Sequence, residues 1–279
     1  MSGRKAVYWS IFWIIVSLVV NAGVYFLFGQ RKAIEFFTGY VIEKSLSVDN
    51  LFVFLLIFSY FNIQPVHQRR VLNYGLIGVV VLRGLLIVLG TTLVHRFHWI
   101  MYIFGAIVVI SGYQMTFGKE KKYEPEKNII FRWFRKLMPI HDDAGTGHFF
   151  VRENNMLHAT PLLAVLLIIE TTDVVFAVDS IPAIFAITTD PIIVFGSNIM
   201  AVLGLRSMYF VLEKSQQKFG YVKYGVGIVL TFVGLKMLFG DLYEVPLPLS
   251  LLIVCGILAA SVLLSYLLKP YQNREASKG

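Results

Sequence analysis

Cysteine is almost absent from this chain of 279 residues, in which Cys255 is the single thiol. One cysteine cannot close a disulfide within the chain or build a metal cluster on cysteine ligands. The six histidines offer no Cys/His pattern typical of a metal site. Any metal chemistry expected of this sequence therefore rests on oxygen ligands.

Motifs for catalysis, nucleotide binding and nucleic-acid binding are missing as well. The chain contains no Gly-x-x-x-x-Gly-Lys-Ser/Thr, His-Glu-x-x-His or Gly-x-Ser-x-Gly pattern. The Tyr-Asp and Gly-x-Gly-Asp pairing of intramembrane aspartyl proteases, in which two carboxylates share a proton, does not occur either. No sequence motif indicates nucleic-acid recognition. We therefore expect no enzymatic activity, no ATP-driven step and no nucleic-acid partner.

Charge is sparse too: 15% of the residues are charged, 57% are hydrophobic, and the mean hydropathy is +0.69. Soluble domains average about 25% charged residues. Apolar runs of about 20 residues can cross the hydrocarbon core of a bilayer as helices. They occur at residues 7–28, 38–61, 71–93, 98–117, 160–187, 192–212, 221–239 and 247–268. We predict an all-α, polytopic membrane bundle of about eight transmembrane helices, forming a single domain over residues 1–279.

Basic residues outside the predicted helices indicate the orientation of the chain. Of the 25 Lys and Arg residues, four lie near one membrane face and three lie within helices, which leaves 18 on the face that carries both termini. The positive-inside rule therefore predicts cytoplasmic termini in a bacterial inner membrane. The net charge of +8 follows from this topology and from contact with lipid headgroups. The four are Arg31, Lys32, Arg96 and Lys236, and the three are Lys44, Arg83 and Arg206.

The sequence repeats itself across three predicted helices. WIMYIFGAIVVISGYQM (99–115) aligns without gaps on YVKYGVGIVLTFVGLKM (221–237), and acids and arginines of the preceding helices align in the same order. The pairs are Glu43 with Asp173, Asp49 with Asp179, Asn50 with Ser180, and Arg83 with Arg206. Because each repeat holds an odd number of helices, the second copy crosses the membrane in the opposite direction. We predict inverted three-helix repeats at about 38–117 and 160–239, joined by a cytoplasmic loop at about 118–158 and flanked by helices at about 7–28 and 247–268.

Two predicted helices carry acids at membrane depth, in EKSLSVDN (43–50) and ETTDVVFAVDS (170–180). Ionisable groups there are costly and mark a functional site by default. Five carboxylates face three cations, which leaves a surplus of two negative charges and favours a hard metal cation. The acids are Glu43, Asp49, Glu170, Asp173 and Asp179, and the cations, which we interpret as charge-balancing or gating partners, are Lys44, Arg83 and Arg206.

Helical spacing does not direct all these carboxylates to one point. At 100° per residue, Glu43 and Asn50 lie in a stripe on one side of their helix, and Asp173 and Ser180 lie in a stripe on one side of theirs. Asp49 and Asp179 each come six residues after the first acid of the pair and lie about 120° away around the helix. Pro182 could loosen its helix and gather the carboxylates, or the two stripes could line two half-channels. Salt bridges that only hold helices together would explain some of the charges, but five acids outnumber three bases.

These strings also resemble a known family. FTGYVIEKSLSVDNLFVF (37–54), HFFVRENNMLHATPLL (148–163) and IIETTDVVFAVDSIPAIFAITTDP (168–191) resemble the TerC integral membrane proteins, especially the Alx-type branch that looks like proton-linked manganese exporters. The resemblance extends from about Trp9 to Leu268. It implies efflux of Mn(II), with the metal as transported substrate. The implied ligands are Glu43, Asp49, Asn50, Glu170, Asp173, Asp179 and Ser180.

The donor chemistry agrees with that expectation, because carboxylate, amide and hydroxyl oxygens suit Mn(II), Mg(II) or Ca(II) better than Zn(II) or Cu(I). The choice among the three hard cations stays open. The family's tellurium-resistance name suggests oxyanion transport as an alternative, against which the negative surplus argues. A membrane scaffold that aids metal supply or protein insertion is a further alternative. We expect no resident cofactor; the expected partners are divalent ions, protons and the lipid bilayer, while a homodimer and secreted-enzyme partners stay open.

Overall fold

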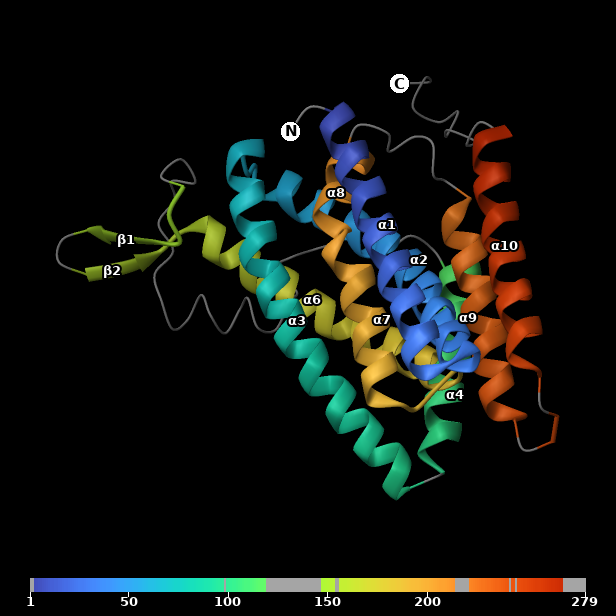
Figure 1. Ribbon diagram of the computed structural model, residues 1–279. Coiled ribbons are helices and arrows are strands. Elements are labelled where there is room, and N and C mark those ends of the chain that lie inside the picture. The colour runs from blue at the N-terminus through green and yellow to red at the C-terminus, as the bar shows by residue number, and fades with distance from the viewer. Residues whose placement is uncertain are drawn as a thin grey trace.

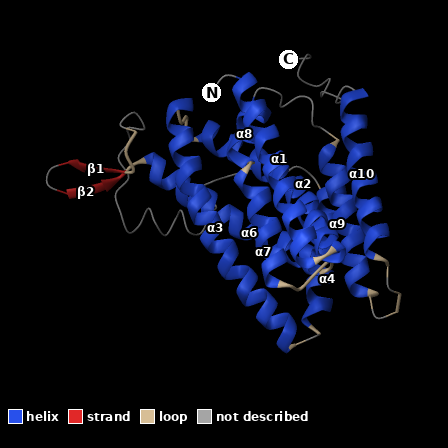
Figure 2. Cartoon of the chain, in the orientation of Figure 1, coloured by secondary structure: helices blue, strands red, loops and turns tan. Residues whose placement is uncertain are grey.

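The computed structural model describes residues 3–97, 99–118, 147–153, 156–213, 221–240, 242–243 and 245–267, without the side chains of Asp49, Glu153, Met156 and Leu157. Most of the predicted loop at 118–158 therefore lies outside the described residues. The described elements are α1 (Gly3–Phe28), α2 (Gln30–Tyr60), α3 (Pro65–Arg96), α4 (Ile100–Phe117), β1 (Phe150–Glu153), β2 (Met156–Ala159), α6 (Pro161–Phe185), α7 (Pro191–Leu203), α8 (Leu205–Glu213), α9 (Val222–Leu238) and α10 (Leu247–Leu267). Helices make up almost all of them, apart from the antiparallel β1–β2 hairpin ahead of α6 (Figure 2).

Each of the eight apolar segments coincides with one helix or with the broken span α7–α8. Six spans in the described part of the chain are long and apolar enough to cross a membrane. The other two segments are α2, which charged residues interrupt, and α9, which has 17 residues. The predicted all-α, polytopic membrane bundle is confirmed.

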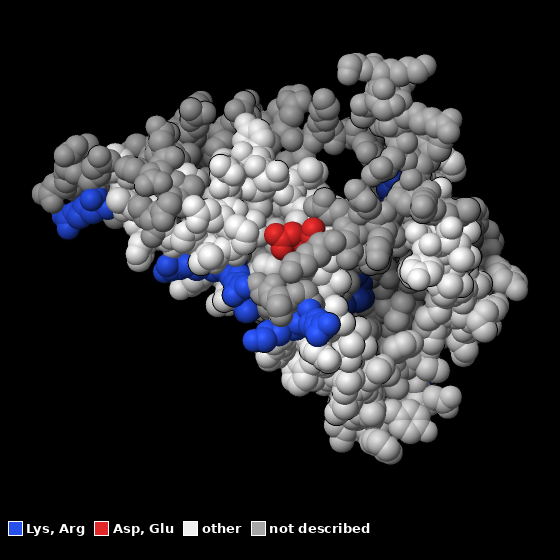
Figure 3. Space-filling view, turned by 90° about the horizontal axis from the view of Figure 1, so that it is seen from above, with Lys and Arg blue, Asp and Glu red and all other residues white. Residues whose placement is uncertain are grey.

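Both ends of the described chain lie on the same side of the bundle. Figure 1 shows the start of α1 and the end of α10 at one end, as an even number of crossings requires. Seen from that end, the surface carries several groups of Lys and Arg side chains (Figure 3). This arrangement agrees with the prediction that both termini share one membrane face.

Close approach of α4 to α9 depends on two pairs of glycines. A Cβ added at Gly112 would lie 2.6 Å from the carbonyl oxygen of Gly227, and a Cβ at Gly234 would lie 2.9 Å from that of Gly105. Small residues let membrane helices approach backbone to backbone, because lipid chains provide no hydrophobic force that drives apolar helices together. The register is antiparallel, since contacts move down one helix as they move up the other. The other main lengthwise contacts join α2 with α7 and α3 with α6.

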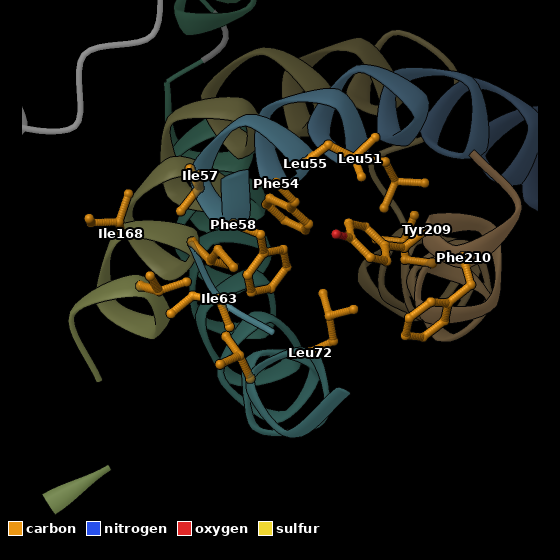
Figure 4. Packing of buried hydrophobic residues seen from close by; sticks show 14 of the residues in the cluster. Leu51, Phe54, Leu55, Ile57, Phe58, Ile63, Leu72, Ile168, Tyr209 and Phe210 are labelled. Carbon is orange, nitrogen blue, oxygen red and sulfur yellow. The ribbon is translucent and has the colours of Figure 1, made fainter. Parts of the chain in front are cut away.

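The end of α2 is held by the largest buried apolar cluster in the described residues, which also involves α3, α6 and α8 (Figure 4). The rings of Phe58 and Tyr209 meet edge to face, with centroids 5.5 Å apart. The Tyr209 hydroxyl donates a hydrogen bond to Gln68 Oε1 at 3.0 Å, so the cluster contains no unsatisfied phenol. This packing fixes the direction in which the preceding turns of α2 present their polar residues.

The interruption of the membrane helices lies at Gly204 rather than near Pro182, where the sequence suggested it. Helix α6 continues through Pro182 to Phe185, so the idea that Pro182 unwinds it to gather the carboxylates is wrong. The interruption falls at Gly204, between α7 and α8. There the ammonium of Lys44 donates to the carbonyl oxygen of Ala201 at 3.0 Å. A cation at this position satisfies one carbonyl at the end of α7 and interacts favourably with the helix dipole.

Candidate functional site

Arg83 joins four helices through a buried polar network. Its guanidinium donates from Nε and Nη2 to the two carboxylate oxygens of Asp173, at 2.9 and 2.8 Å. Nη1 donates to Glu43 Oε1 and, at 2.8 Å, to Asn198 Oδ1. Asn198 Nδ2 in turn donates to Glu43 Oε2 at 3.2 Å, and Ser47 Oγ donates to Glu43 Oε1 at 3.4 Å. The network connects α2, α3, α6 and α7.

The network is buried, so the stability of the fold depends on its charges being paired. Arg83 and Glu43 are fully buried, and Asp173 is 1% exposed. Two carboxylates against one guanidinium give a formal charge of minus one, with Asn198 supplying neutral hydrogen bonds. A buried charge is tolerated when its partners satisfy it, whereas removing one partner leaves an uncompensated ion. Both network acids are thus already bound to a cation of the protein.

The other two predicted charge partners lie elsewhere. Lys44 binds the end of α7 as described above, and no hydrogen bond or ion pair to an acid is seen for it among the described residues. Arg206 is exposed and donates to Asn73 Oδ1. The alignment of Arg206 with Arg83 therefore predicted the wrong environment for Arg206, which is exposed in α8. Of the three cations, Arg83 alone is fully buried and contacts acids within the described residues.

A pocket of about 280 Å³ lies between α2, α4, α6 and α9. Its polar lining comes from Asn50, Ser111, Gln114, Asp179 and Ser180. Ser111 Oγ donates to Asp179 Oδ1 at 2.7 Å, while the Ser180 hydroxyl, 2% exposed, has no hydrogen-bond partner in the described structure. Buried hydroxyls normally find a partner. The pocket therefore has unused capacity to bind a polar ligand or water.

A larger hollow of about 760 Å³ lies near the starts of α2, α4 and α10 and the ends of α6 and α9. It is bordered by Glu35 of α2, Tyr102 of α4, Ala186 after α6 and Lys236 of α9, among others. Between the two hollows, α2, α4, α6 and α9 each contribute one residue to a buried apolar cluster. These residues, 0–1% exposed, form what we call the apolar layer: Ile42, Val108, Ala183 and Val233.

The seven predicted ligands thus separate into groups. Glu43 and Asp173 meet at Arg83, whereas Asn50, Asp179 and Ser180 line the pocket. The carboxylate of Glu170 lies against Gly78 of α3, with Oε2 lacking a hydrogen-bond partner in the described structure. The Asp49 side chain lies outside the described residues, although its backbone belongs to α2. Within the described residues, no three His, Cys, Asp or Glu side chains are grouped closely enough to hold a metal ion.

Three polar residues of these regions were not predicted from the sequence. Asn198 belongs to the Arg83 network, and Ser111 and Gln114 line the pocket. Each is a neutral residue within an apolar helix, so charge counting could not find it. The signal available was the three-residue spacing of Ser111 and Gln114, which places them on one face of α4.

Comparisons with known proteins agree with this architecture. The profile described as "Integral membrane protein TerC family" matches residues 28–273. The chain belongs to the TerC family. A Salmonella typhi protein provisionally described as a membrane-bound redox modulator, Alx, is 46% identical over 273 residues, covering 95% of this chain and 85% of the relative. The Escherichia coli K12 protein of the same name is 45% identical over the same shares, and an uncharacterized membrane protein of Myxococcus xanthus is 45% identical over 94% and 82%. No solved structure matches the chain.

Proposed function

We propose that this TerC-family protein exports Mn(II) from the cytoplasm in exchange for protons, through a site of oxygen ligands near the membrane midplane. The observation that carries the proposal is the pocket whose lining includes the Asp179 carboxylate, Asn50 and the unpartnered Ser180 hydroxyl. Such oxygens suit hard divalent cations, and an ionisable group at membrane depth marks an ion pathway by default. Of the seven ligands that the resemblance implies, the proposal places three in this pocket, namely Asn50, Asp179 and Ser180. Asp49 and Glu170 remain proposed ligands, whereas Glu43 and Asp173 are held by Arg83 in the conformation described.

Helix packing supports an inverted repeat as the basis of alternating access. In the two repeats, α2 corresponds to α6, α3 to α7 and α4 to α9. The α2–α7 contact therefore corresponds to the α6–α3 contact, and both contacts are extensive. The same correspondence turns the Gly112–Gly227 approach between α4 and α9 into Gly234–Gly105, which also occurs. Transporters built from inverted repeats move one unit against the other around a fixed midplane site. The apolar layer would then separate that site from the larger hollow in the conformation described.

Export of the metal ion needs a separate source of free energy. Moving a divalent cation out against an inside-negative potential costs about 4.6 kcal/mol per 100 mV, at about 2.3 kcal/mol per charge. Protons are a suitable counter-ion, because a carboxylate in a poorly hydrated site favours protonation when the metal leaves, and a bound cation reverses that preference. Metal and proton would therefore compete for Asp179.

We place both termini in the cytoplasm, which puts the larger hollow at the outer face and the pocket on the cytoplasmic side of the apolar layer. Basic residues outside the spans favour this orientation. Cysteine labelling in whole cells tests it: residues near Lys214 should be protected from an impermeant reagent, and residues near Asp190 should react. The same exposure at both positions would contradict the topology.

Oxyanion transport has less support. Its binding groups would be Arg83, Lys44 and Arg206, but these contact two carboxylates, a helix carbonyl and an asparagine respectively. None of the three lines the pocket.

Flux in proteoliposomes tests the proposed function. Purified protein should move Mn(II) down an imposed gradient, move protons in the opposite direction, and respond to a pH gradient at clamped potential. Metal flux without proton counter-movement would exclude the exchange mechanism. An absence of Mn(II) flux in correctly folded protein would exclude export and favour a scaffold role.

A further inference from the structure

Helix α4 contributes to the pocket although it carries no acid. Ser111 and Gln114 lie one turn apart on α4, and both line the pocket together with Asn50 of α2 and Asp179 of α6. Ser111 Oγ donates to Asp179 Oδ1 at 2.7 Å, which holds the carboxylate toward α4. The second feature that indicates a ligand is independent of this bond: the Ser180 hydroxyl is 2% exposed and unpartnered in the described structure.

The size and charge of the pocket fit a partly hydrated cation. About 280 Å³ corresponds to roughly nine waters at about 30 Å³ each. Its described lining offers one carboxylate and four neutral oxygens, from Asn50, Ser111, Gln114 and Ser180. Hard divalent cations take six or more oxygen ligands and commonly retain water. Glu43 and Asp173 are held by Arg83, and the carboxylate of Glu170 lies against Gly78 of α3, outside the pocket lining. The described oxygens that can meet in one site are therefore those of the pocket.

We propose that Ser111 and Gln114 of α4 are ligand residues for a partly hydrated divalent cation, together with Asp179, Asn50 and Ser180. The identity of the cation as Mn(II) rests on the proposed export function. Asp179 supplies the negative charge, Gln114 Oε1 and Ser180 Oγ supply neutral oxygens, and Ser111 both orients Asp179 and offers its own hydroxyl oxygen.

The repeat explains why such a site would form once. In the gapless alignment of 99–115 with 221–237, Ser111 matches Val233 and Gln114 matches Lys236. The second repeat thus places a methyl-bearing side chain and an ammonium where α4 has a hydroxyl and an amide. Val233 belongs to the apolar layer, and Lys236 borders the larger hollow. A cation that leaves through that hollow would meet a repelling charge rather than a second binding site.

Variants of the full-length protein in detergent and in liposomes test the proposal. Gln114→Lys installs the residue of the second repeat, and its ammonium should occupy the cation's place. We expect Mn(II) binding, followed by the loss of the free-ion electron paramagnetic resonance signal, to weaken at least tenfold. Ser111→Ala should raise the KM for Mn(II) several-fold with a smaller change in maximal flux. Gln114→Glu retains an oxygen ligand and adds charge, so binding should be kept or strengthened.

Matched controls separate ligand loss from structural damage. Ser250 of α10 is also buried with an unpartnered hydroxyl but does not line the pocket, so Ser250→Ala should leave binding unchanged while Ser180→Ala weakens it. Tyr113→Phe changes an exposed residue beside Gln114 and should also bind normally. Thermal unfolding monitors the fold of each variant.

The outcomes distinguish this inference from the proposed function. If the wild type transports Mn(II) and folded Gln114→Lys and Ser111→Ala bind it with unchanged affinity, the α4 ligands are refuted and export stands. If Gln114→Lys does not fold, unchanged binding in Ser111→Ala together with weakened binding in Gln114→Glu overturns the inference. If the wild type binds divalent cations through these residues but moves none across the membrane, the site stands and export is refuted.

Discussion

Two polar regions of this membrane protein use the same side chains in opposite ways. At Arg83, the carboxylates of Glu43 and Asp173 are fully buried and bound to a guanidinium. In the pocket, Asp179 receives one hydrogen bond from Ser111, and Ser180 has no partner within the described structure. The difference teaches that acids at membrane depth are not equivalent: a satisfied carboxylate stabilises the helix contacts, and an incompletely satisfied one can bind a ligand.

Arg83→Gln should have the largest effect, because it leaves Glu43 and Asp173 buried without their cation. Removing one partner from a buried ion pair costs about 3–5 kcal/mol. Arg206→Gln is the matched control, since Arg206 is exposed and such surface changes cost about 0.5 kcal/mol or less. Thermal unfolding in detergent and the yield of monodisperse protein measure both. Equal stability of the two variants would remove the distinction between Arg83 and Arg206.

Asparagine replacements at the two aspartates of α6 should separate function from stability. Asp179→Asn keeps an oxygen acceptor for Ser111 and removes the charge, so we expect Mn(II) flux to fall at least tenfold, about 1.4 kcal/mol, with little loss of stability. Asp173→Asn should lose transport mainly because it destabilises the fold, since it breaks the bidentate contact with Arg83. Flux per folded molecule compares them. Unstable Asp179→Asn beside stable Asp173→Asn would reverse the assigned roles.

The two polar regions also show which features of the structure the sequence could predict. Apolar run length predicted all eight segments, because a helix is almost the only way to satisfy a backbone in lipid. The pairing of Glu43 with Asp173 anticipated residues that share Arg83. Spacing on a single helix could not decide how the stripes of two helices face one another, so Asp173 and Asp179 were assigned to one ligand set although the structure places them in different surroundings.

Neutral residues were harder to predict than charged ones. An isolated Ser or Gln in an apolar helix commonly satisfies itself on its own backbone, as Ser45 does on the carbonyl of Val41. Residue type therefore gives no reason to choose Ser111 over Ser45, and the spacing of Ser111 and Gln114 does not show what their face of α4 contacts. The crossing of α4 and α9 decides it, because that contact sets which face of α4 borders Asp179. Residue identity also did not reveal that Arg206 is exposed, since the arginine with which it aligns, Arg83, is fully buried.

Polarising the apolar layer should connect the pocket to the larger hollow. Val108→Thr or Val233→Thr adds a hydroxyl that can bind water, which contributes about 1 kcal/mol and corresponds to about fivefold faster passive leak. Val81→Thr on the exposed face of α3 is the control. Mn(II) leak without an imposed proton gradient is the measurement. Unchanged leak in both layer variants would place the barrier at another level of the bundle.

The smallest expected effect concerns a polar contact far from both regions. Lys32 Nζ lies 3.0 Å from Glu35 Oε2 and 3.0 Å from Asp190 Oδ2, which links the start of α2 to the start of α7. Partial burial alone would raise the pKa of Asp190, but the bonds from Lys32 and from the backbone amides of Ile192 and Ile193 outweigh it and lower that pKa below its ordinary value. The folded state therefore binds this proton less readily than the unfolded state.

The sign of the pH dependence follows. A depressed carboxylate pKa contributes stability above the unfolded value of about 3.9, and that contribution disappears as pH falls through the lower folded value. Asp190→Ser isolates the ion pair, because serine also caps a helix well while the charge is lost. At neutral pH and low salt the variant should be less stable by about 0.2–1 kcal/mol, the range of exposed pairs, and the difference should shrink in high salt and vanish at the acid end. A stability difference that persists unchanged in acid and in salt would not come from the charge of Asp190, and its ion pair with Lys32 would then add nothing to the contact between α2 and α7.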